Sequence, residues 1–131
     1  MRRARQFGFT YLWNSELPMP DNASIKLLFV CSRNRLRSRT AEKIYADHSR
    51  IKASSAGTSD RARRTIQSAD LGWADIVVVM EKRHREQLRN RFPAEMRYKE
   101  CYVLDISDDY QYMDPELIQL ITDRVEGILG L

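Results

Sequence analysis

The sequence predicts an α/β fold in which helices cover both faces of a parallel sheet. From residue 25 onward, short apolar runs alternate with segments of helical periodicity, which is typical of a parallel sheet. The run Ile76-Val77-Val78-Val79 is continuously apolar and β-branched, as in a strand buried on both faces. The length of 131 residues suits one domain with a substantial core.

Each element has its own local signal. Strands are expected at 25–31, 51–56, 75–80 and 101–104; the ranges 25–31 and 75–80 carry continuous apolar runs, and 51–56 is a short strand that Gly57 ends. The helix expected at 38–49 begins at a potential N-cap, Ser38, and its apolar face repeats at helical spacing through Ala41, Ile44, Tyr45 and His48. A weak helical turn is expected at 65–71 and a helix at 81–91, which Phe92-Pro93 should stop. Asp114 as N-cap and Pro115 as the first helical residue predict the start of the last helix.

Composition favours a soluble globular protein. Hydrophobic residues make up 43% of the chain and charged residues 31%, and no apolar run approaches the length of a membrane span. Two cysteines without a secretory signal favour reduced thiols and a cytoplasmic location. Neither His48 nor His84 has metal-ligand neighbours at suitable spacing, so no metal or cofactor is expected.

The formal net charge of +4 permits nucleic-acid binding and is therefore not decisive. Acidic residues are interspersed among the basic ones, and no aromatic-interleaved basic stripe is present. The pattern favours a solvated surface together with a local electropositive anion site.

Residues 1–25 differ in character from the rest and are expected to form an N-terminal extension. Pro18 and Pro20 indicate a loop before the first strand. The aromatic segment 7–13 could form an added strand, pack on the domain or contact a second subunit, which leaves an oligomer possible. Residues 26–131 are expected to form the functional domain.

The most informative stretch is the loop that follows the first strand, Cys31-Ser32-Arg33-Asn34-Arg35-Leu36-Arg37-Ser38. Ligands of parallel sheets bind at the carboxyl ends of strands, and a loop leading into a helix directs backbone N–H groups toward an anion. A thiolate and a guanidinium in such a loop suggest hydrolysis of a phosphate ester. The spacing of Cys31 and Arg37 alone fits a buried structural cysteine before a solvated helix start equally well.

Several motifs together resemble the low-molecular-weight protein tyrosine phosphatase family, from about Ile25 to the C-terminus. The resemblance rests on segments in the family's order: Val30-Cys31-x-x-Asn34-x-x-Arg37-Ser38-x-x-Ala41-Glu42, Ser55-Ala56-Gly57-Thr58, Ala62-Arg63, Asp70-Leu71, Ala74-Asp75-Ile76-Val77 with Met80, and Ile106-Ser107-Asp108-Asp109-Tyr110. It implies a three-layer, four-stranded parallel sheet with strand order 2-1-3-4.

The resemblance also assigns roles to the loop. Cys31 would be the nucleophile, forming a cysteinyl-phosphate, and Arg37 would clamp two phosphate oxygens. Ser38 could donate a hydrogen bond to the thiolate, cap the helix, or do both. Asn34 is expected to adopt a left-handed backbone and pin the loop, although an ordinary turn asparagine fits too. The remaining phosphate-binding positions would be Ser32, Arg33, Arg35 and Leu36.

A general acid must protonate the leaving oxygen, and four aspartates are candidates. Asp108 follows Ile-x, as the family's acid does, and is the first choice, with Asp109 second. Asp105 is a third candidate, at the end of the last predicted strand. Asp114-Pro115 is better explained as a helix start.

The chain departs from the family in places that bear on substrate choice. Arg33 stands where glycine is usual, Leu36 where a second cysteine is usual, and Asp109 where proline is typical. The segment between Thr58 and Ala62 is much shorter than the family's counterpart, which forms one wall of the cleft. Arg33 and Arg35 would favour an anionic substrate, unless they point into solvent or pair with the domain's own carboxylates.

The predicted function is hydrolysis of phosphotyrosine-type monoesters, with a phosphorylated protein or another anionic phosphoester as the partner. One alternative is a phosphate-binding or RNA-associated domain without turnover. Another is arsenate reduction, known on the same scaffold, which needs relay cysteines of which only Cys101 remains.

Overall fold

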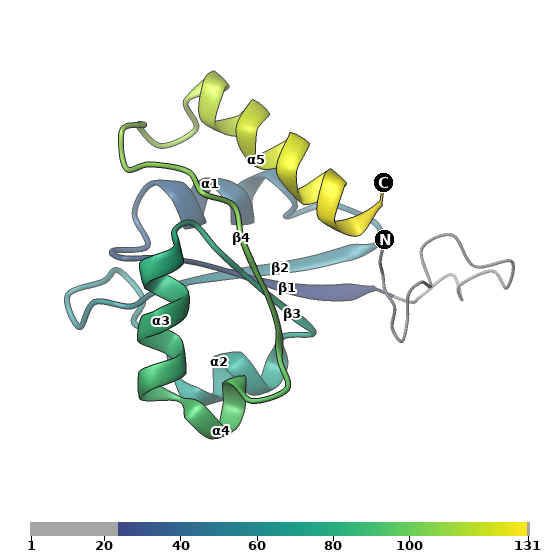
Figure 1. Cartoon of the computed structure of the whole chain (residues 1–131). Helices are drawn as coiled ribbons and strands as arrows, with labels where there is room; N and C mark the ends of the chain where they lie inside the picture. The colour runs from purple at the N-terminus through teal and green to yellow at the C-terminus, as the bar shows by residue number, and fades with distance from the viewer. Residues whose placement is uncertain (1–23, 131) are drawn as a thin grey trace, which may run out of the picture.

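The structure, a computed structural model, describes residues 24–130, and its centre is a parallel sheet of four strands (Figure 1). The sheet order is β2-β1-β3-β4, and every neighbouring pair is parallel. This arrangement confirms the predicted fold class and strand order. The strands are β1 (Ile25–Cys31), β2 (Ile51–Gly57), β3 (Ile76–Val79) and β4 (Glu100–Val103).

Helices cover both faces of the sheet, which gives the three layers visible in Figure 1. One apolar core includes Ala41 of α1 (Arg37–Ile44) and four residues of α5 (Pro115–Leu129). The other core, on the opposite face, joins the sheet to α2 (Ser68–Trp73), α3 (Lys82–Arg91) and α4 (Pro93–Met96). The central strand β1 has Leu27, Leu28, Phe29 and Val30 fully buried, because alternate residues enter the two cores.

The helix after β1 differs from the sequence-based prediction at both ends. It begins at Arg37, one residue early, and its N-cap is Leu36, which has no capping side chain. Ser38 therefore lies in the first turn, and the prediction of Ser38 as N-cap was wrong; its hydroxyl bonds Cys31 instead. The helix ends at Ile44, so His48 lies beyond it.

The other helices follow their local signals more closely. Asp114 caps α5 by accepting a hydrogen bond from the Glu116 backbone N–H, and Pro115 occupies the first turn. Pro93 ends α3 as predicted and also begins the short helix α4, which the sequence analysis did not expect. The weak turn expected at 65–71 is the helix α2, displaced toward the C-terminus.

The carboxyl ends of β1, β2, β3 and β4 lie along one edge of the sheet. After β1 the chain crosses to β2 on one side, whereas β3 lies on the other side of β1. The chain connections at the end of β1 therefore lead to opposite sides of this strand, and open parallel sheets bind ligands in the crevice that forms at such a point. Cys31 ends β1 at this point.

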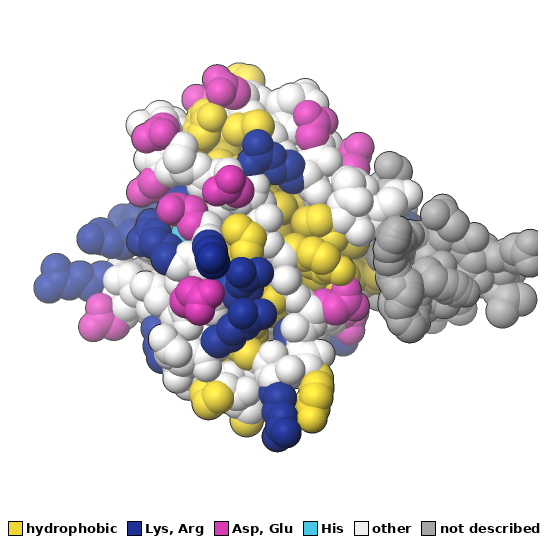
Figure 2. All heavy atoms as spheres, viewed as in Figure 1, with side chains coloured by type: hydrophobic (Ala, Val, Ile, Leu, Met, Phe, Trp, Pro, Cys, Tyr) yellow, Lys and Arg dark blue, Asp and Glu magenta, His cyan; other side chains and the backbone are white. Residues whose placement is uncertain are grey.

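The predicted extension, residues 1–25, lies almost entirely outside the described residues, and so does its proposed contact with a second subunit. No helix within residues 24–130 is long and apolar enough to cross a bilayer. Basic and acidic side chains are interspersed over the face shown in Figure 2, with a group of Lys and Arg side chains near its centre.

Candidate active site

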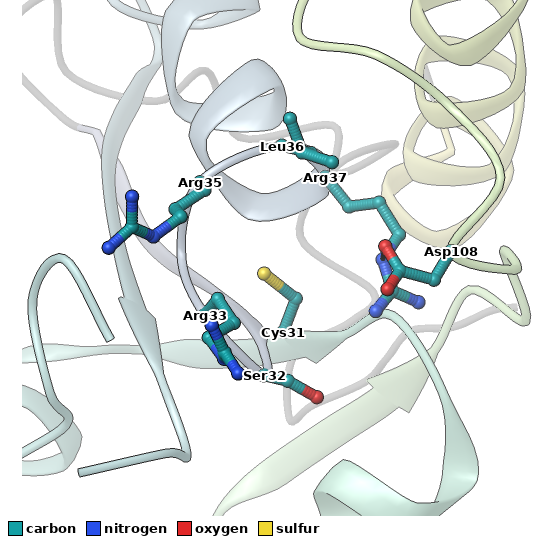
Figure 3. A pocket seen from close by; sticks show the side chains of 7 residues that line it. All are labelled: Cys31, Ser32, Arg33, Arg35, Leu36, Arg37 and Asp108. Carbon is teal, nitrogen blue, oxygen red and sulfur yellow. Dashed lines mark ion pairs between the residues drawn. The ribbon is translucent and has the colours of Figure 1, made fainter. Parts of the chain in front are cut away.

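A cavity of about 170 Å³ opens at the carboxyl end of β1 (Figure 3). It contains seven of the nine residues predicted for the site: Cys31, Ser32, Arg33, Arg35, Leu36, Arg37 and Asp108. The other two, Asn34 and Ser38, are fully buried and contact the Cys31 sulfur. The structure therefore brings all nine residues together, with Asp108 arriving from the segment after β4.

Cys31 presents its sulfur to two hydrogen-bond partners. The backbone N–H of Asn34 donates to Sγ at 3.2 Å, and the Ser38 hydroxyl lies 3.0 Å from Sγ. The Cys31 side chain is only 3% exposed. Hydrogen bonds of this kind stabilise a sulfur that carries negative charge.

A chain of side-chain hydrogen bonds leads from Arg63 through Asn34 to Ser38. Arg63 donates from Nη2 to Asn34 Oδ1 at 2.9 Å, which orients the amide so that Nδ2 faces Ser38. Nδ2 then donates to Ser38 Oγ at 2.8 Å. Because Ser38 Oγ accepts that bond, its own proton is free to point at Cys31 Sγ.

Asn34 has the left-handed backbone predicted for it, with φ of 56°. Asparagine tolerates this conformation better than most residues. Arg63 also donates from Nε to the Asn34 carbonyl oxygen at 3.0 Å, so the left-handed turn is held from outside the loop.

Arg37 is 2% exposed, and the hydrogen bonds that its guanidinium donates come from one end of the group. Nη1 donates to the Ile106 carbonyl oxygen at 2.8 Å and to a carboxylate oxygen of Glu81. Nε is buried and has no hydrogen-bond partner, and the Asp108 carboxylate lies 3.5 Å from it. The occupied end fixes the plane of the guanidinium, which leaves the other end for the bidentate contact that suits a phosphate.

Glu81 follows β3 and holds the anchored end of Arg37. Hydrogen bonds from Arg83, and then from Arg37, lower the pKa of Glu81 to about 2. The carboxylate is therefore charged at neutral pH. It bridges Arg37 and Arg83, which fixes the guanidinium and offsets part of its charge.

Asp108 is the one acidic residue in the lining of this cavity, and its side chain is 61% exposed. The other three candidates are placed differently. Asp109 accepts a hydrogen bond from the Ser107 hydroxyl, and Asp114 caps α5. Asp105 is exposed, has φ of 58°, and its carbonyl oxygen accepts a bond from Arg124.

Ser32 is joined to a histidine buried behind the loop. His84 is 0% exposed, and burial lowers its pKa to about 4, so the ring is neutral at pH 7. The Glu81 backbone N–H donates to Nδ1 at 3.0 Å, which places the ring proton on Nε2. Nε2 therefore donates to Ser32 Oγ at 3.0 Å, and the Ser32 hydroxyl proton is free for a ligand in the cavity.

The short segment after β2 supports the loop directly. The backbone N–H groups of Thr58, Ser59 and Arg63 donate to the carbonyl oxygens of Cys31, Ser32 and Arg33, respectively. Gly57 allows this close approach, because a Cβ at that position would lie 2.5 Å from the Ser32 carbonyl oxygen. No residue of 58–62 is in the lining of the cavity, so this segment supports the loop and does not wall the site.

Sequence reasoning missed the supporting roles of Glu81, His84 and Arg63. The sequence signal for Glu81 was available, because it follows a buried strand at the carboxyl edge of the sheet. Arg63 was noted only within a motif, and nothing local indicated that it would reach Asn34. His84 was considered as a metal ligand, and its sequence neighbours did not support that role.

The second cysteine lies on the other side of the sheet. Cys31 belongs to the core beneath α1 and α5, whereas Cys101 packs against the opposite core. Burial raises the pKa of Cys101 to about 11, so it stays a protonated thiol. Within residues 24–130, no group of three or more His, Cys, Asp or Glu side chains is arranged to hold a metal ion.

No protein-family model and no curated protein sequence matches the chain. Solved structures do match. The YwlE arginine phosphatase from Geobacillus stearothermophilus is 21% identical with a TM-score of 0.63, over 79% of this chain and 91% of that one. The tyrosine phosphatase Wzb from Escherichia coli K30, in complex with phosphate, is 20% identical with a TM-score of 0.64, over 80% and 96%.

A third match is SP-PTP, a low molecular weight protein tyrosine phosphatase from Streptococcus pyogenes. It is 18% identical with a TM-score of 0.59, over 79% of this chain and 89% of that one. Each of the three matches covers about four-fifths of this chain and about nine-tenths or more of the matched one. The chain has the fold of the low-molecular-weight protein tyrosine phosphatases.

Proposed function

We propose that the protein hydrolyses phosphate monoesters of the phosphotyrosine type through a cysteinyl-phosphate intermediate. One observation carries the proposal: Cys31 Sγ, the end of Arg37 that donates no hydrogen bond and the Asp108 carboxylate paired with it converge on one cavity. A nucleophile, an oxyanion clamp and a proton donor are the three parts that this reaction needs.

In the first step the Cys31 thiolate attacks phosphorus. The S–P bond forms as the bond from phosphorus to the ester oxygen breaks. Protonated Asp108 gives its proton to the departing oxygen, which leaves as an alcohol or phenol. Arg37 holds two of the phosphoryl oxygens through Nε and Nη2, and the Ser32 hydroxyl donates to an oxygen at the mouth of the loop.

In the second step water attacks the cysteinyl-phosphate. The Asp108 carboxylate takes a proton from the water as the new O–P bond forms. The S–P bond breaks and the electron pair returns to sulfur. The Ser38 hydroxyl and the Asn34 backbone N–H then stabilise the thiolate as the leaving group.

The direct test is turnover of a chromogenic aryl phosphate by the wild type and by Cys31→Ser. We expect turnover by the wild type and none by Cys31→Ser, while inorganic phosphate or vanadate still binds the variant. Acid quenching during turnover should trap one phosphoryl group on Cys31, detectable by peptide mass spectrometry. Turnover by Cys31→Ser at the wild-type rate would contradict the covalent mechanism.

Arg37→Lys separates the clamp from the nucleophile. Lysine keeps the positive charge but lacks the planar fork, so both turnover and oxyanion binding should weaken. Phosphate binding by the wild type without any turnover would instead favour a non-catalytic anion-binding domain.

Arsenate reduction has less support. The fold places Cys31 and Cys101 in cores on opposite faces of the sheet, and Leu36 stands where the family's second cysteine would be. No second thiol among the described residues is therefore positioned to attack a thiol adduct of Cys31.

A further inference from the structure

A second cavity, of about 200 Å³, lies beside the catalytic loop and is not part of the proposed reaction. Three of its six lining residues are cationic. They come from two separate segments of the chain, α1 and the segment between β2 and α2. The lining consists of Arg39, Glu42, Lys43, Ala46, Arg63 and Tyr112.

The positive charge of this cavity is not compensated by acidic partners. Arg39, Lys43 and Arg63 form no ion pair with any carboxylate of residues 24–130. Glu42 is the one acid in the lining, and it accepts a hydrogen bond from the Ser55 hydroxyl. Three cations and one carboxylate leave a formal charge of +2 around a space large enough for a tetrahedral oxyanion.

Two of the three cationic side chains that line the cavity are also held in place. Arg63 is fixed by its two bonds to Asn34, and the Arg39 guanidinium lies 4.5 Å from the centre of the Tyr112 ring. Residues 39, 42, 43 and 46 occupy one face of α1 and of the turn that follows it. Cationic donors fixed around a concave space bind an anion at a lower entropy cost than free surface lysines.

We propose that this cavity is a second oxyanion site that takes a phosphate group. Arg39 and Lys43 supply charge-assisted hydrogen bonds, and Arg63 supplies the charge nearest the catalytic loop. The phosphate could be free in solution or could be a second phosphate on a substrate whose first phosphate occupies the Cys31 loop. Because Arg63 contacts Asn34, an anion here would lie directly behind the catalytic loop.

The first experiment is a phosphate titration followed by NMR on the full, uniformly ¹⁵N-labelled chain at constant pH. Sodium chloride of equal ionic strength is the control for screening. The backbone amides of Lys43, Ala46 and Tyr112 report the second cavity, whereas those of Ser32 and Arg35 report the catalytic loop. We expect saturable shifts in the cavity group with phosphate and not with chloride.

The double variant Arg39→Ala/Lys43→Ala should weaken phosphate binding at the cavity amides by at least about tenfold and leave the loop amides titrating as before. The matched control Lys52→Ala/Arg97→Ala also removes one lysine and one arginine, both exposed and outside either cavity. It should leave both groups of shifts unchanged. Cavity shifts that do not saturate, that chloride reproduces, or that survive in the double variant would overturn the proposal.

A second experiment distinguishes the two sources of phosphate and rests on the proposed function, which the titration does not. It compares kcat/KM for singly and doubly phosphorylated peptides of one sequence. A preference for the doubly phosphorylated peptide that disappears in Arg39→Ala/Lys43→Ala assigns the cavity to a substrate phosphate. Equal kcat/KM values, together with a saturable titration, assign it to free phosphate.

Discussion

The hydroxyl of Ser38 lies 3.0 Å from the sulfur of Cys31 and accepts a hydrogen bond from the Asn34 amide, which leaves its proton free to donate to a Cys31 thiolate. The amide of Asn34 is in turn fixed by Arg63. The buried loop thus carries an ordered series of donors from Arg63 to the sulfur. Its effect is greatest when sulfur holds negative charge, before attack and after the S–P bond breaks.

Ser38→Ala should therefore slow hydrolysis by about 10- to 100-fold, the value of one hydrogen bond to a charged group. The loss should appear in the breakdown of the intermediate, so that more cysteinyl-phosphate accumulates at steady state than in the wild type. Quenched-flow mass spectrometry would measure the fraction of the protein that carries the cysteinyl-phosphate at steady state. Ser38→Thr keeps the hydroxyl and should restore most of the rate; equal loss in both variants would mean that Ser38 acts through packing.

Asp108→Asn should slow hydrolysis of esters with poor leaving groups by about 100-fold or more, and of those with good leaving groups much less. Only a basic leaving oxygen needs a proton in the transition state. A series of aryl phosphates with graded phenol pKa values measures this effect: kcat should depend more steeply on the phenol pKa in Asp108→Asn than in the wild type. Asp109→Asn is the neighbouring control and should keep the wild-type slope.

Asp114→Ala should instead lower the free energy of unfolding by about 1 kcal/mol, because the helix loses its N-cap.

Arg33 and Arg35 should favour acidic substrates. Both are exposed, both line the catalytic cavity, and neither forms an ion pair with a described carboxylate. Figure 3 shows Arg35 extending from the loop on the opposite side of Cys31 from Arg37 and Asp108. A cationic leaving group such as that of phosphoarginine should be disfavoured there.

The measurement is kcat/KM for matched acidic and basic phosphopeptides at low and high salt. The acidic peptide should be preferred at low salt, and each of Arg33→Ala and Arg35→Ala should reduce that preference by ~2- to 5-fold. High salt should reduce the preference as well. The same kcat/KM for both peptides, unchanged by either substitution, would refute this selectivity.

His84 predicts a dependence of stability on pH. Its pKa is lowered from 6.5 to about 4 in the folded protein because burial disfavours the charged ring. Between pH 6.5 and 4 the unfolded chain binds a proton that the folded protein does not, so the free energy of unfolding falls as pH falls through this range. The loss for this one group is on the order of 3 kcal/mol.

Urea unfolding at a series of pH values would measure the dependence. His84→Asn should flatten the slope between pH 6.5 and 4. His84→Asn should also lower turnover at pH 7, because the bond that orients Ser32 is lost. A slope that persists in His84→Asn would assign the pH dependence to other groups.

Local sequence signals determined the layered fold and most of the proposed catalytic residues. The apolar runs at 25–31 and 76–79 could be recognised as buried strands. Hydrophobic periodicity and the content of β-branched side chains are local properties of the chain, so they can be read without the fold. The proposed nucleophile and its arginine could be recognised because they belong to one short loop. The start of α5 was found because its cap and proline are adjacent.

Only the tertiary structure decided how that loop is supported and where its free donors point. Glu81 reaches Arg37 across 44 residues, Arg63 reaches Asn34 across 29, and His84 reaches Ser32 across 52. It also decided that Ser38 contacts the sulfur and does not cap its helix. These contacts depend on which strands are neighbours and how their ends align, and periodicity along the chain carries no information about either.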